Sequence, residues 1–214
     1  MPQYLFDSSN LDTNYKILPA DHSRRVLRAG DRLWHTDSSF NPMPTKWSML
    51  SGRIVPPSGG NTEFADIRAA YDALSDAMKA RIEDLVAEHC IWHTREKGGM
   101  TVFTTEHEQS LPPVMHPLVR IIPRSGRKSY MAGAHARRII GMDADEGAKL
   151  IQELTDFATQ DEFVYSHKWR VNDLVIWDNC CTLHRGTPFE DLKYKCDMRR
   201  TTIDEYAPSW AAVG

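Results

Sequence analysis

The chain has 214 residues, of which 41% are hydrophobic and 26% charged, an ordinary balance for a single globular domain with a substantial core. Its formal net charge of -3 at pH 7 provides no overall basic field for a nucleic-acid backbone, so we expect no nucleic-acid partner. No apolar run approaches the roughly 18 residues that cross a bilayer, and the first residues lack the pattern of a leader peptide, so we expect no membrane partner.

The four cysteines, at positions 90, 180, 181 and 196, form no Cys-x-x-Cys motif, and the adjacent pair is poorly placed for a disulfide. A reducing compartment fits this usage, and we expect a cytoplasmic protein. The basic pairs Arg24-Arg25 and Arg137-Arg138 are interpreted as solvated surface. The sequence leaves association into a homo-oligomer open.

The first elements of the chain are a connecting segment and two strands. Residues 1–31 are polar and weakly patterned, which predicts a connection ahead of one domain over residues 32–214. Residues 46–55 read as a strand, and the proline- and glycine-rich run 56–61 turns the chain into a second strand over 62–67.

The middle of the chain predicts helices and a loop. From Asp66 to about His89 apolar residues recur at three- and four-residue steps, which predicts one amphipathic helix. The polar, glycine-containing stretch 94–113 is typical of a mobile loop, and such loops are often lids. Short strands are expected at 118–122 and 128–132, and a second helix from about 143 to 159.

The last part alternates strand and turn signals. Strands are expected over 163–169, 174–179 and 197–204. Many short strands with only two inserted helices favour a mostly β fold with flanking helices, an antiparallel sandwich or barrel of jelly-roll type.

A candidate metal-binding pair lies in the stretch LWHTDSSF, residues 33–40. If residues 32–38 form a strand, His35 and Asp37 point to the same face and both enter the barrel. One more histidine would complete the 2-His-1-carboxylate triad of non-haem ferrous oxygenases. The spacing alone also occurs by chance, and an ordinary polar pair is the alternative.

The third ligand must come from another histidine. His184 has the best context, because it follows an apolar strand and a turn and re-enters extended structure. His135 and His167 lie in or beside predicted strands and stay open as alternatives. The remaining histidines are assigned surface roles; they are His22, His89, His93, His107 and His116.

Five ordered blocks carry a resemblance to a known family: LWHTDSSF, GGNTEFADIRAAYDAL, FVYSHKWRVNDLVIWDN, TLHRGTPF and DMRRTTID. From about Arg32 to Asp204 the chain resembles the taurine dioxygenase family of iron(II)- and 2-oxoglutarate-dependent dioxygenases. It is most similar to the 2,4-dichlorophenoxyacetate (aryloxyalkanoate) dioxygenase branch. The resemblance implies a double-stranded β-helix, or jelly roll, and the five blocks in order are far more specific than any one of them.

The resemblance also implies the reaction and the site. His35, Asp37 and His184 match the iron ligands of the family, and Thr62 matches a threonine that helps to hold 2-oxoglutarate. Arg200 matches an arginine that meets the acidic group of the substrate. The implied cofactors are Fe(II), 2-oxoglutarate as cosubstrate and O2, and the implied substrate is a small carboxylic acid. An unactivated C–H bond of this acid is oxidised, with release of succinate and CO2.

The chain departs from the family pattern at one anchor. The family has an arginine about a dozen residues after the distal histidine, where it pairs with the far carboxylate of 2-oxoglutarate; this chain has Cys196. A guanidinium makes two charge-assisted bonds to a carboxylate and a thiol makes none. Strand alternation places Cys196, Met198 and Arg200 on one face, so Arg200 is expected to serve the cosubstrate, the substrate or both.

Two further observations limit what the resemblance implies. Relatives carry several dozen residues ahead of the point that matches Met1, so we expect the chain to lack part of the N-terminal segment of the family. Without the resemblance, Thr62 reads as a strand threonine bonded to a neighbouring carbonyl. With it, Trp177, Asp178 and Asn179 look like scaffold around the distal ligand, and Trp177 is expected in the core rather than in the site.

Two alternatives to an oxygenase stay open from the sequence. A degenerate family member would bind a metal or a small acid without efficient turnover, as Cys196 suggests. A cupin-like metal enzyme that needs no oxoacid is the other, and Thr62 and the block DMRRTTID argue against it.

Overall fold

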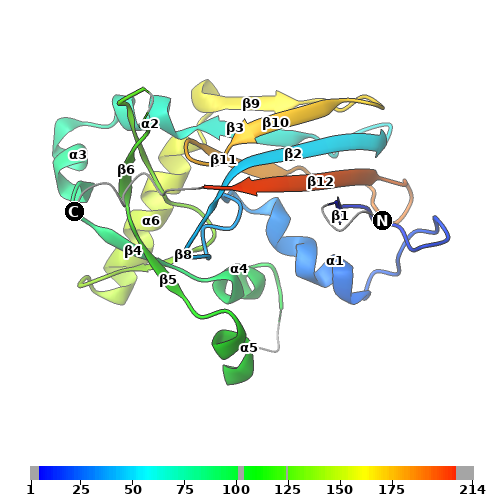
Figure 1. Cartoon of the computed structure of the whole chain (residues 1–214), viewed down its shortest axis with the longest axis horizontal. Helices are drawn as coiled ribbons and strands as arrows, with labels where there is room; N and C mark the ends of the chain where they lie inside the picture. The colour runs from blue at the N-terminus through cyan, green and yellow to red at the C-terminus, as the bar shows by residue number, and fades with distance from the viewer. Residues whose placement is uncertain (1–4, 101–103, 124, 206–214) are drawn as a thin grey trace.

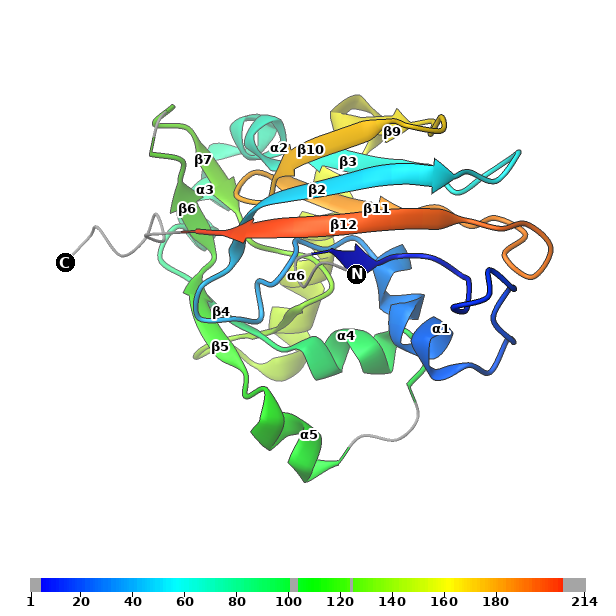
Figure 2. The same cartoon turned by 45° about the vertical axis from the view of Figure 1, so that its right-hand side comes forward.

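The computed structural model describes residues 5–100, 104–123 and 125–205. Its centre is a pair of antiparallel sheets, which lie one behind the other in Figure 1. Figure 2 shows the same sheets from a second angle. In spatial order, the first sheet contains β1 (Phe6–Asp7), β12 (Asp197–Asp204), β2 (Thr45–Ile54) and β10 (Leu174–Asp178). The second contains β11 (Thr182–Gly186), β3 (Thr62–Asp66) and β9 (Val164–His167). The strands expected around 46–55, 62–67, 163–169, 174–179 and 197–204 are all present.

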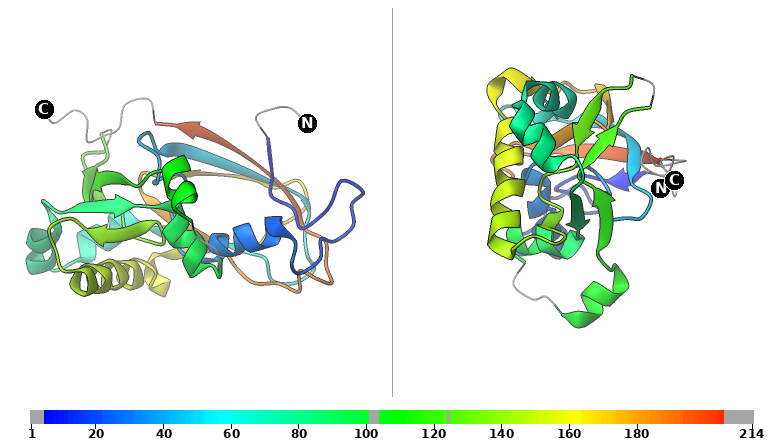
Figure 3. Two further views of the ribbon diagram at one scale, coloured as in Figure 1. Left: turned by 90° about the horizontal axis from the view of Figure 1, so that it is seen from below. Right: turned by 90° about the vertical axis from the view of Figure 1, so that its left-hand side faces the viewer.

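Smaller sheets and helices lie at one end of this pair of sheets (Figure 3). One sheet has the order β5 (Val114–Pro117), β4 (Val86–His89), β8 (Ala136–Ile139), and a two-stranded sheet joins β6 (Val119–Ile121) to β7 (Lys128–Tyr130). Three helices pack here: α2 (Ile67–Ala73), α3 (Asp76–Ile82) and α6 (Ala144–Ala158). A short 3-10 helix, η2 (Asp161–Phe163), leads into β9.

The main hydrophobic core joins the helical end to the second sheet. Leu150 and Leu154 of α6 and Leu183 of β11 are fully buried members of one cluster. The buried hydroxyl of Tyr130 donates to the carbonyl of Leu154 at 2.9 Å, so no polar group is left unpaired at this position. This packing fixes β11, and with it the backbone beside Leu183, against a rigid base.

The described N-terminal residues add a strand and a helix to the sheet pair. In β1, Phe6 pairs with Arg200 and Asp7 with Arg199 of β12. The helices α1 (Ser23–Arg28) and η1 (Ala29–Arg32) follow, and α1 lies below β12 in Figure 2. The domain boundary at residue 31 stays a prediction.

The single helix expected from Asp66 to His89 is wrong. Two helices and a strand occupy this segment, because Leu74 has an extended ψ of 148° and Ser75 caps the next helix by accepting from the N–H of Met78. Asp66 likewise caps α2 through the N–H groups of Arg68 and Ala69. The apolar periodicity continues through the break, so hydrophobic spacing alone does not reveal it.

The mobile loop expected over 94–113 is also wrong in part. The helices α4 (Ile91–Lys97) and α5 (Thr105–Ser110) fall in or across it, and α4 buries Trp92 and Thr94. Thr104 starts α5 with a capping box, a local signal that was missed among the polar residues. Residues 101–103 of this stretch lie outside the described residues.

The strand expected over 32–38 is reduced to a single bridge. His35 pairs with His184 as an isolated antiparallel bridge, and Ser38 then turns the chain with a φ of +54°. Among the described residues no helix has the length and apolarity needed to cross a bilayer.

Candidate metal centre and cosubstrate cavity

Two histidines are placed side by side by backbone hydrogen bonds. The N–H of His35 donates to the carbonyl of His184 at 3.0 Å, and the N–H of His184 donates back at 2.8 Å. Their ring centroids are 4.3 Å apart, and both residues are buried. This reciprocal pair brings together two segments that are far apart in the chain, and His184 is held in place by the core packing of its neighbour Leu183.

Asp37 completes the group. Its carboxylate oxygens lie 3.9 Å from His35 Nε2 and 3.6 Å from His184 Nε2, and one potential ligand atom from each of the three residues lies within 4.8 Å of the others. Two imidazole nitrogens and one carboxylate oxygen are the donor set of the facial triad that non-haem iron(II) oxygenases use.

Hydrogen bonds fix the orientation of the Asp37 carboxylate. Ser48 Oγ donates to Asp37 Oδ2 at 2.6 Å, and Arg200 donates to Asp37 Oδ1 at 2.7 Å. Asn179 supports both sides of this arrangement, because its Oδ1 accepts from the Asp37 N–H at 3.1 Å and its Nδ2 donates to Ser48 Oγ at 2.8 Å. The indole N–H of Trp177 donates to the same Asn179 Oδ1 at 3.1 Å. The carboxylate is therefore held by a connected polar network.

The ionisation states suit a divalent metal. Burial raises the pKa of Asp37, but His184, Arg200 and His35, with the hydrogen bond from Ser48, outweigh it and hold the pKa well below its usual range. Burial, followed by the charge of His35, lowers the pKa of His184 to about 3. At neutral pH the aspartate is thus anionic and the His184 ring neutral, as metal ligation requires.

The tautomer of His35 also fits a metal. Its Nδ1 lies 2.7 Å from the carbonyl of Leu33, which can only accept a hydrogen bond, so Nδ1 carries the proton and Nε2 keeps its lone pair toward Asp37 and His184. Buried donors, correct charges and an oriented tautomer together make this group a fitting site for Fe(II).

The other histidines lie outside this group of three. His135 stacks edge-on to His35 with ring centroids 5.6 Å apart, but its Nδ1 bonds to Thr94 Oγ1 at 2.6 Å. His167, on β9, has its Nε2 3.1 Å from Asp173 and is not among the three residues that converge. The surface role expected for His89 and His116 is wrong, because both are buried where β4 pairs with β5. The remaining three, His22, His93 and His107, are partly exposed.

A cavity of about 540 Å³ opens between the two sheets beside His35 and His184. Thr62 on β3 lines it, and its hydroxyl oxygen accepts from the indole N–H of Trp169 at 2.9 Å. This bond leaves the Thr62 proton to be donated, so the hydroxyl can serve an anion in the cavity. The alternative reading of Thr62, bonded to a neighbouring carbonyl, is not what the described residues show.

The expected face of β12 lines the same cavity. Cys196, Met198 and Arg200 all contribute to its wall, as strand alternation predicts. The Cys196 thiol is half-buried, and burial raises its pKa to about 11. A neutral thiol at this position offers no charge to a carboxylate, so a cation from elsewhere must be considered.

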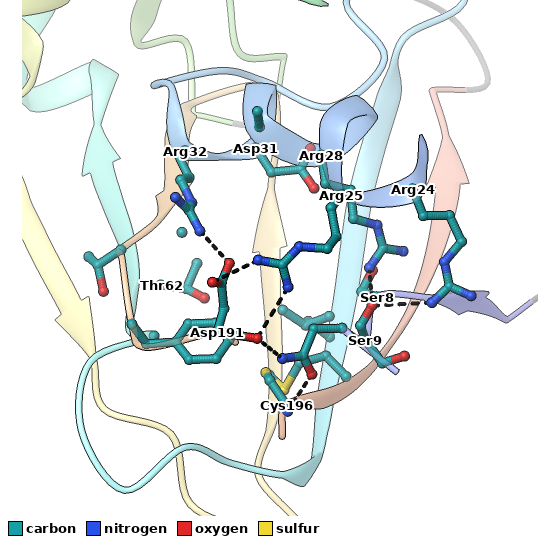
Figure 4. Close-up of a pocket in the computed structure, with 18 of the residues that line it drawn as sticks. Ser8, Ser9, Arg24, Arg25, Arg28, Asp31, Arg32, Thr62, Asp191 and Cys196 are labelled. Carbon is teal, nitrogen blue, oxygen red and sulfur yellow. Dashed lines mark hydrogen bonds and ion pairs between the residues drawn. The ribbon is translucent and has the colours of Figure 1, made fainter. Parts of the chain in front are cut away.

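The helices α1 and η1 supply several cations to this cavity (Figure 4). Arg25 and Arg32 both pair with Asp191 at 2.8 Å, and Arg24 and Arg28 also line the wall. The interpretation of Arg24-Arg25 as solvated surface is therefore wrong for Arg25, whose side chain is only 15% exposed. Helix α1 has only six residues, which is too short for a helical period to be visible in the sequence. The sequence therefore could not predict which face of α1 points into the cavity.

Comparison with known proteins places the chain in a family. A model of the family described as "Taurine catabolism dioxygenase TauD, TfdA family" matches residues 5–202. The chain belongs to the TauD/TfdA dioxygenase family. It is 45% identical over 202 residues to an alpha-ketoglutarate-dependent 2,4-dichlorophenoxyacetate dioxygenase from Cupriavidus pinatubonensis (strain JMP 134 / LMG 1197), covering 94% of this chain and 70% of that one.

Two more TauD/TfdA relatives support the assignment. An (S)-phenoxypropionate/alpha-ketoglutarate-dioxygenase from Sphingobium herbicidovorans is 41% identical over 176 residues, covering 79% of this chain and 61% of that one. The crystal structure of AAD-2 in complex with Mn(II) and N-oxalylglycine superposes with a TM-score of 0.92 at 48% identity, covering 96% of this chain and 74% of that one. The chain thus spans between about six and seven tenths of these curated relatives' length.

The predicted TauD/TfdA family, the jelly-roll fold and the enzyme class, a dioxygenase dependent on iron(II) and 2-oxoglutarate, are confirmed. Which residues of this chain bind the metal and which bind 2-oxoglutarate stays a prediction. Sequence reasoning missed Ser48 and Trp169. Ser48 alternates inward on β2, but serine at such a position carries no signal of its contact with Asp37, which lies in a separate segment.

Proposed function

We propose that this chain uses His35, Asp37 and His184 to hold Fe(II) and oxidises a C–H bond of a small carboxylic acid of the aryloxyalkanoate type. The observation that carries the proposal is the buried group of two imidazoles and one carboxylate on the wall of a cation-rich cavity. When bound there, Fe(II) and 2-oxoglutarate couple O2 reduction and release of succinate and CO2 to oxidation of the substrate.

The residues of the chain have separate tasks in this proposal. Ser48 and Asn179 keep the Asp37 carboxylate in one orientation, so that the ligand geometry is set before the metal binds. Thr62, oriented by Trp169, donates to the far carboxylate of 2-oxoglutarate. Arg200 binds an acidic group, of the substrate, the cosubstrate or both.

A second cavity beside the first supports an aromatic acid as substrate. It has a volume of about 160 Å³ and shares Asp31, His35 and Arg200 with the wall of the first. Its lining is mainly polar, and its large apolar members are Leu27, Phe40 and Ile91. An apolar ring in this second cavity would leave its carboxylate within the reach of Arg200, whose guanidinium matches a carboxylate in geometry. The names of two relatives, which refer to 2,4-dichlorophenoxyacetate and (S)-phenoxypropionate, suggest the same class.

The location of the protein is a proposal of the same kind. Cytoplasmic location is supported by the cysteines, all four of which are free thiols. The sequence leaves association into a homo-oligomer open, and no observation on the described residues bears on it.

A screen of small carboxylic acids for substrate-stimulated succinate formation tests the function. The panel contains phenoxyacetic, 2-phenoxypropionic and aliphatic acids of similar size, with the His184→Ala variant as the control for adventitious iron. We expect stimulation by at least one aryloxy acid in the unaltered chain and none in the variant. An unaltered chain that forms the visible charge-transfer band with iron(II) and 2-oxoglutarate but turns over no acid would favour the second candidate.

The second candidate is a degenerate family member that binds metal and acid without efficient turnover. Its supporting observation is Cys196, a neutral thiol where relatives are expected to have the cosubstrate-binding arginine. If no band forms even at saturating 2-oxoglutarate, the dioxygenase proposal fails as well.

A further inference from the structure

The cavity wall at Cys196 poses a problem for cosubstrate binding. If the proposed function holds, the far carboxylate of 2-oxoglutarate lies near Cys196 and needs a cation at that place. A half-buried carboxylate that finds no cation loses the hydration of water without gaining a charge-assisted hydrogen bond. The candidates are the arginines that line the cavity, which come from α1 and η1 and from β12. Their existing partners distinguish them.

Most of these arginines are already paired with carboxylates. Arg25 and Arg32 bind Asp191, Arg24 lies 3.5 Å from Asp7, and Arg200 donates to Asp37. In Figure 4, Arg25 and Arg32 point toward Asp191, whereas Arg24 and Arg28 point toward Ser8 and Ser9. Arg28 differs from the others because no carboxylate of the described residues lies within 4.0 Å of it.

The contacts of Arg28 are two backbone carbonyls. Its Nη1 donates to the carbonyl of Ser9 at 2.8 Å, and its Nη2 donates to the carbonyl of Asp7. A guanidinium has five N–H donors, so donors remain for a further acceptor. Burial lowers the pKa of Arg28, but an arginine stays protonated at any physiological pH. Arg28 is therefore a partly desolvated positive charge without a countercharge in contact.

The position of Arg28 is next to Cys196. The N–H of Ser8 donates to the carbonyl of Met198 at 2.9 Å, and the N–H of Asn10 donates to the carbonyl of Cys196 at 3.1 Å. Ser9, whose carbonyl Arg28 holds, thus lies directly across from the β12 segment that faces the cavity. The charge of Arg28 acts on the Cys196 thiol, against the larger effect of burial, and also on Arg200.

We propose that Arg28, from helix α1, binds the far carboxylate of 2-oxoglutarate and so replaces the arginine that the family resemblance predicts at position 196. The inference rests on the proposed function of the cavity. Its consequence is a division of labour, in which Arg28 and Thr62 hold the cosubstrate. Arg200, whose charge is already paired with Asp37 through one donor, keeps further N–H donors for the substrate carboxylate.

The test compares two cosubstrates and two arginines. Chain loaded anaerobically with iron(II) is titrated with 2-oxoglutarate and with pyruvate, a 2-oxoacid without the far carboxylate, and binding is read from the charge-transfer band. We expect Arg28→Gln to weaken 2-oxoglutarate binding by about 10- to 100-fold and to leave pyruvate binding unchanged. Arg24→Gln is the matched control, because Arg24 also bonds to the carbonyls of Ser9 and Leu11 and should leave the affinity for both acids unchanged.

A second pair of variants tests the replacement itself. Cys196→Arg in the Arg28→Gln background should restore tight 2-oxoglutarate binding, whereas Cys196→Arg alone should leave the affinity as it is, because the anchor is already present. The Cys196→Arg single variant keeps Arg28, so its 2-oxoglutarate affinity remains a decisive test if Arg28→Gln does not fold.

Three outcomes would overturn the inference. They are unchanged 2-oxoglutarate affinity in Arg28→Gln, equal weakening for pyruvate, and tightening by about 10-fold or more in Cys196→Arg alone. A chain that forms no band with either acid would instead defeat the proposed function, so the two failures are distinguishable.

Discussion

At the scale of single residues, the choice of the third ligand can be tested with two histidines. His184→Ala removes one of three converging donors, so we expect the affinity for iron(II) to fall by more than about 100-fold. His167→Ala, on β9 and bonded to Asp173, should change it by no more than about 2-fold. Iron per chain after gel filtration measures both. Retention in His184→Ala together with loss in His167→Ala would show that the wrong histidine was chosen.

The same scale shows what the sequence reveals of a site and what it does not. His35 and Asp37 could be proposed as ligands because a histidine and an aspartate two residues apart fit a chelating pair, and the ordered family blocks, with the one around His184, made that reading specific. Ser48 and Trp169 were not recognisable, since a serine or tryptophan on a strand has many uses and its partner lies elsewhere in the chain. The role proposed for Arg28 could not be read from the sequence for a related reason. It depends on the proximity of Arg28 to Cys196, and only the fold brings these two residues together.

At the scale of elements, Gly133 allows the backbone of the segment that carries His35 to pack closely against it. Its φ is +111°, and a Cβ added there would lie 2.8 Å from the carbonyl oxygen of Trp34 and 3.6 Å from His35 Cα. We expect Gly133→Ala to lower the free energy of unfolding by about 3 kcal/mol or more and to weaken metal binding, because the added atom displaces this backbone. Urea unfolding and a manganese titration measure the two effects.

Gly141 provides the matched control for backbone strain. Its φ is +78°, and an added Cβ would meet no atom within 4 Å. Gly141→Ala should therefore lower the free energy of unfolding by about 1–2 kcal/mol without changing metal affinity. Equal loss of metal affinity in both variants would contradict the role assigned to Gly133.

Helices and strands were predicted correctly where one face of the element is buried in the core, and wrongly where a helix begins or ends inside a continuous apolar pattern. The alternation in β2 and β12 and the apolar face of α6 were readable, because packing on the core imposes a period. The boundary at Ser75 and the helix α5 depend on a single cap each, and a cap is a local hydrogen bond that hydrophobic spacing does not record.

At the scale of the whole molecule, buried neutral histidines predict sensitivity to acid. His89 is 1% exposed, and burial, followed by the charge of His116, lowers its pKa to about 3. Below an unfolded-state pKa of about 6.5 the unfolded chain binds a proton that the native chain does not. This contribution to stability is therefore complete above about pH 6.5 and is lost as the pH falls toward 3.

Urea unfolding between pH 7 and pH 5 measures this effect. We expect His89 to contribute about 2 kcal/mol to the fall in the free energy of unfolding across this range, with a slope that approaches about 1.4 kcal/mol per pH unit below pH 6. His89→Gln should reduce the slope by about one proton, and an unchanged slope in this variant would contradict the burial of a neutral imidazole there.

The bridge between His35 and His184 has a consequence for the life of the protein before it is complete. Because the two imidazoles meet only when β11 has docked on the helical core, a nascent polypeptide that ends before His184 lacks the complete group of three proposed ligands. If this group holds iron as proposed, iron bound there reports that synthesis has passed His184 and that the two segments have paired.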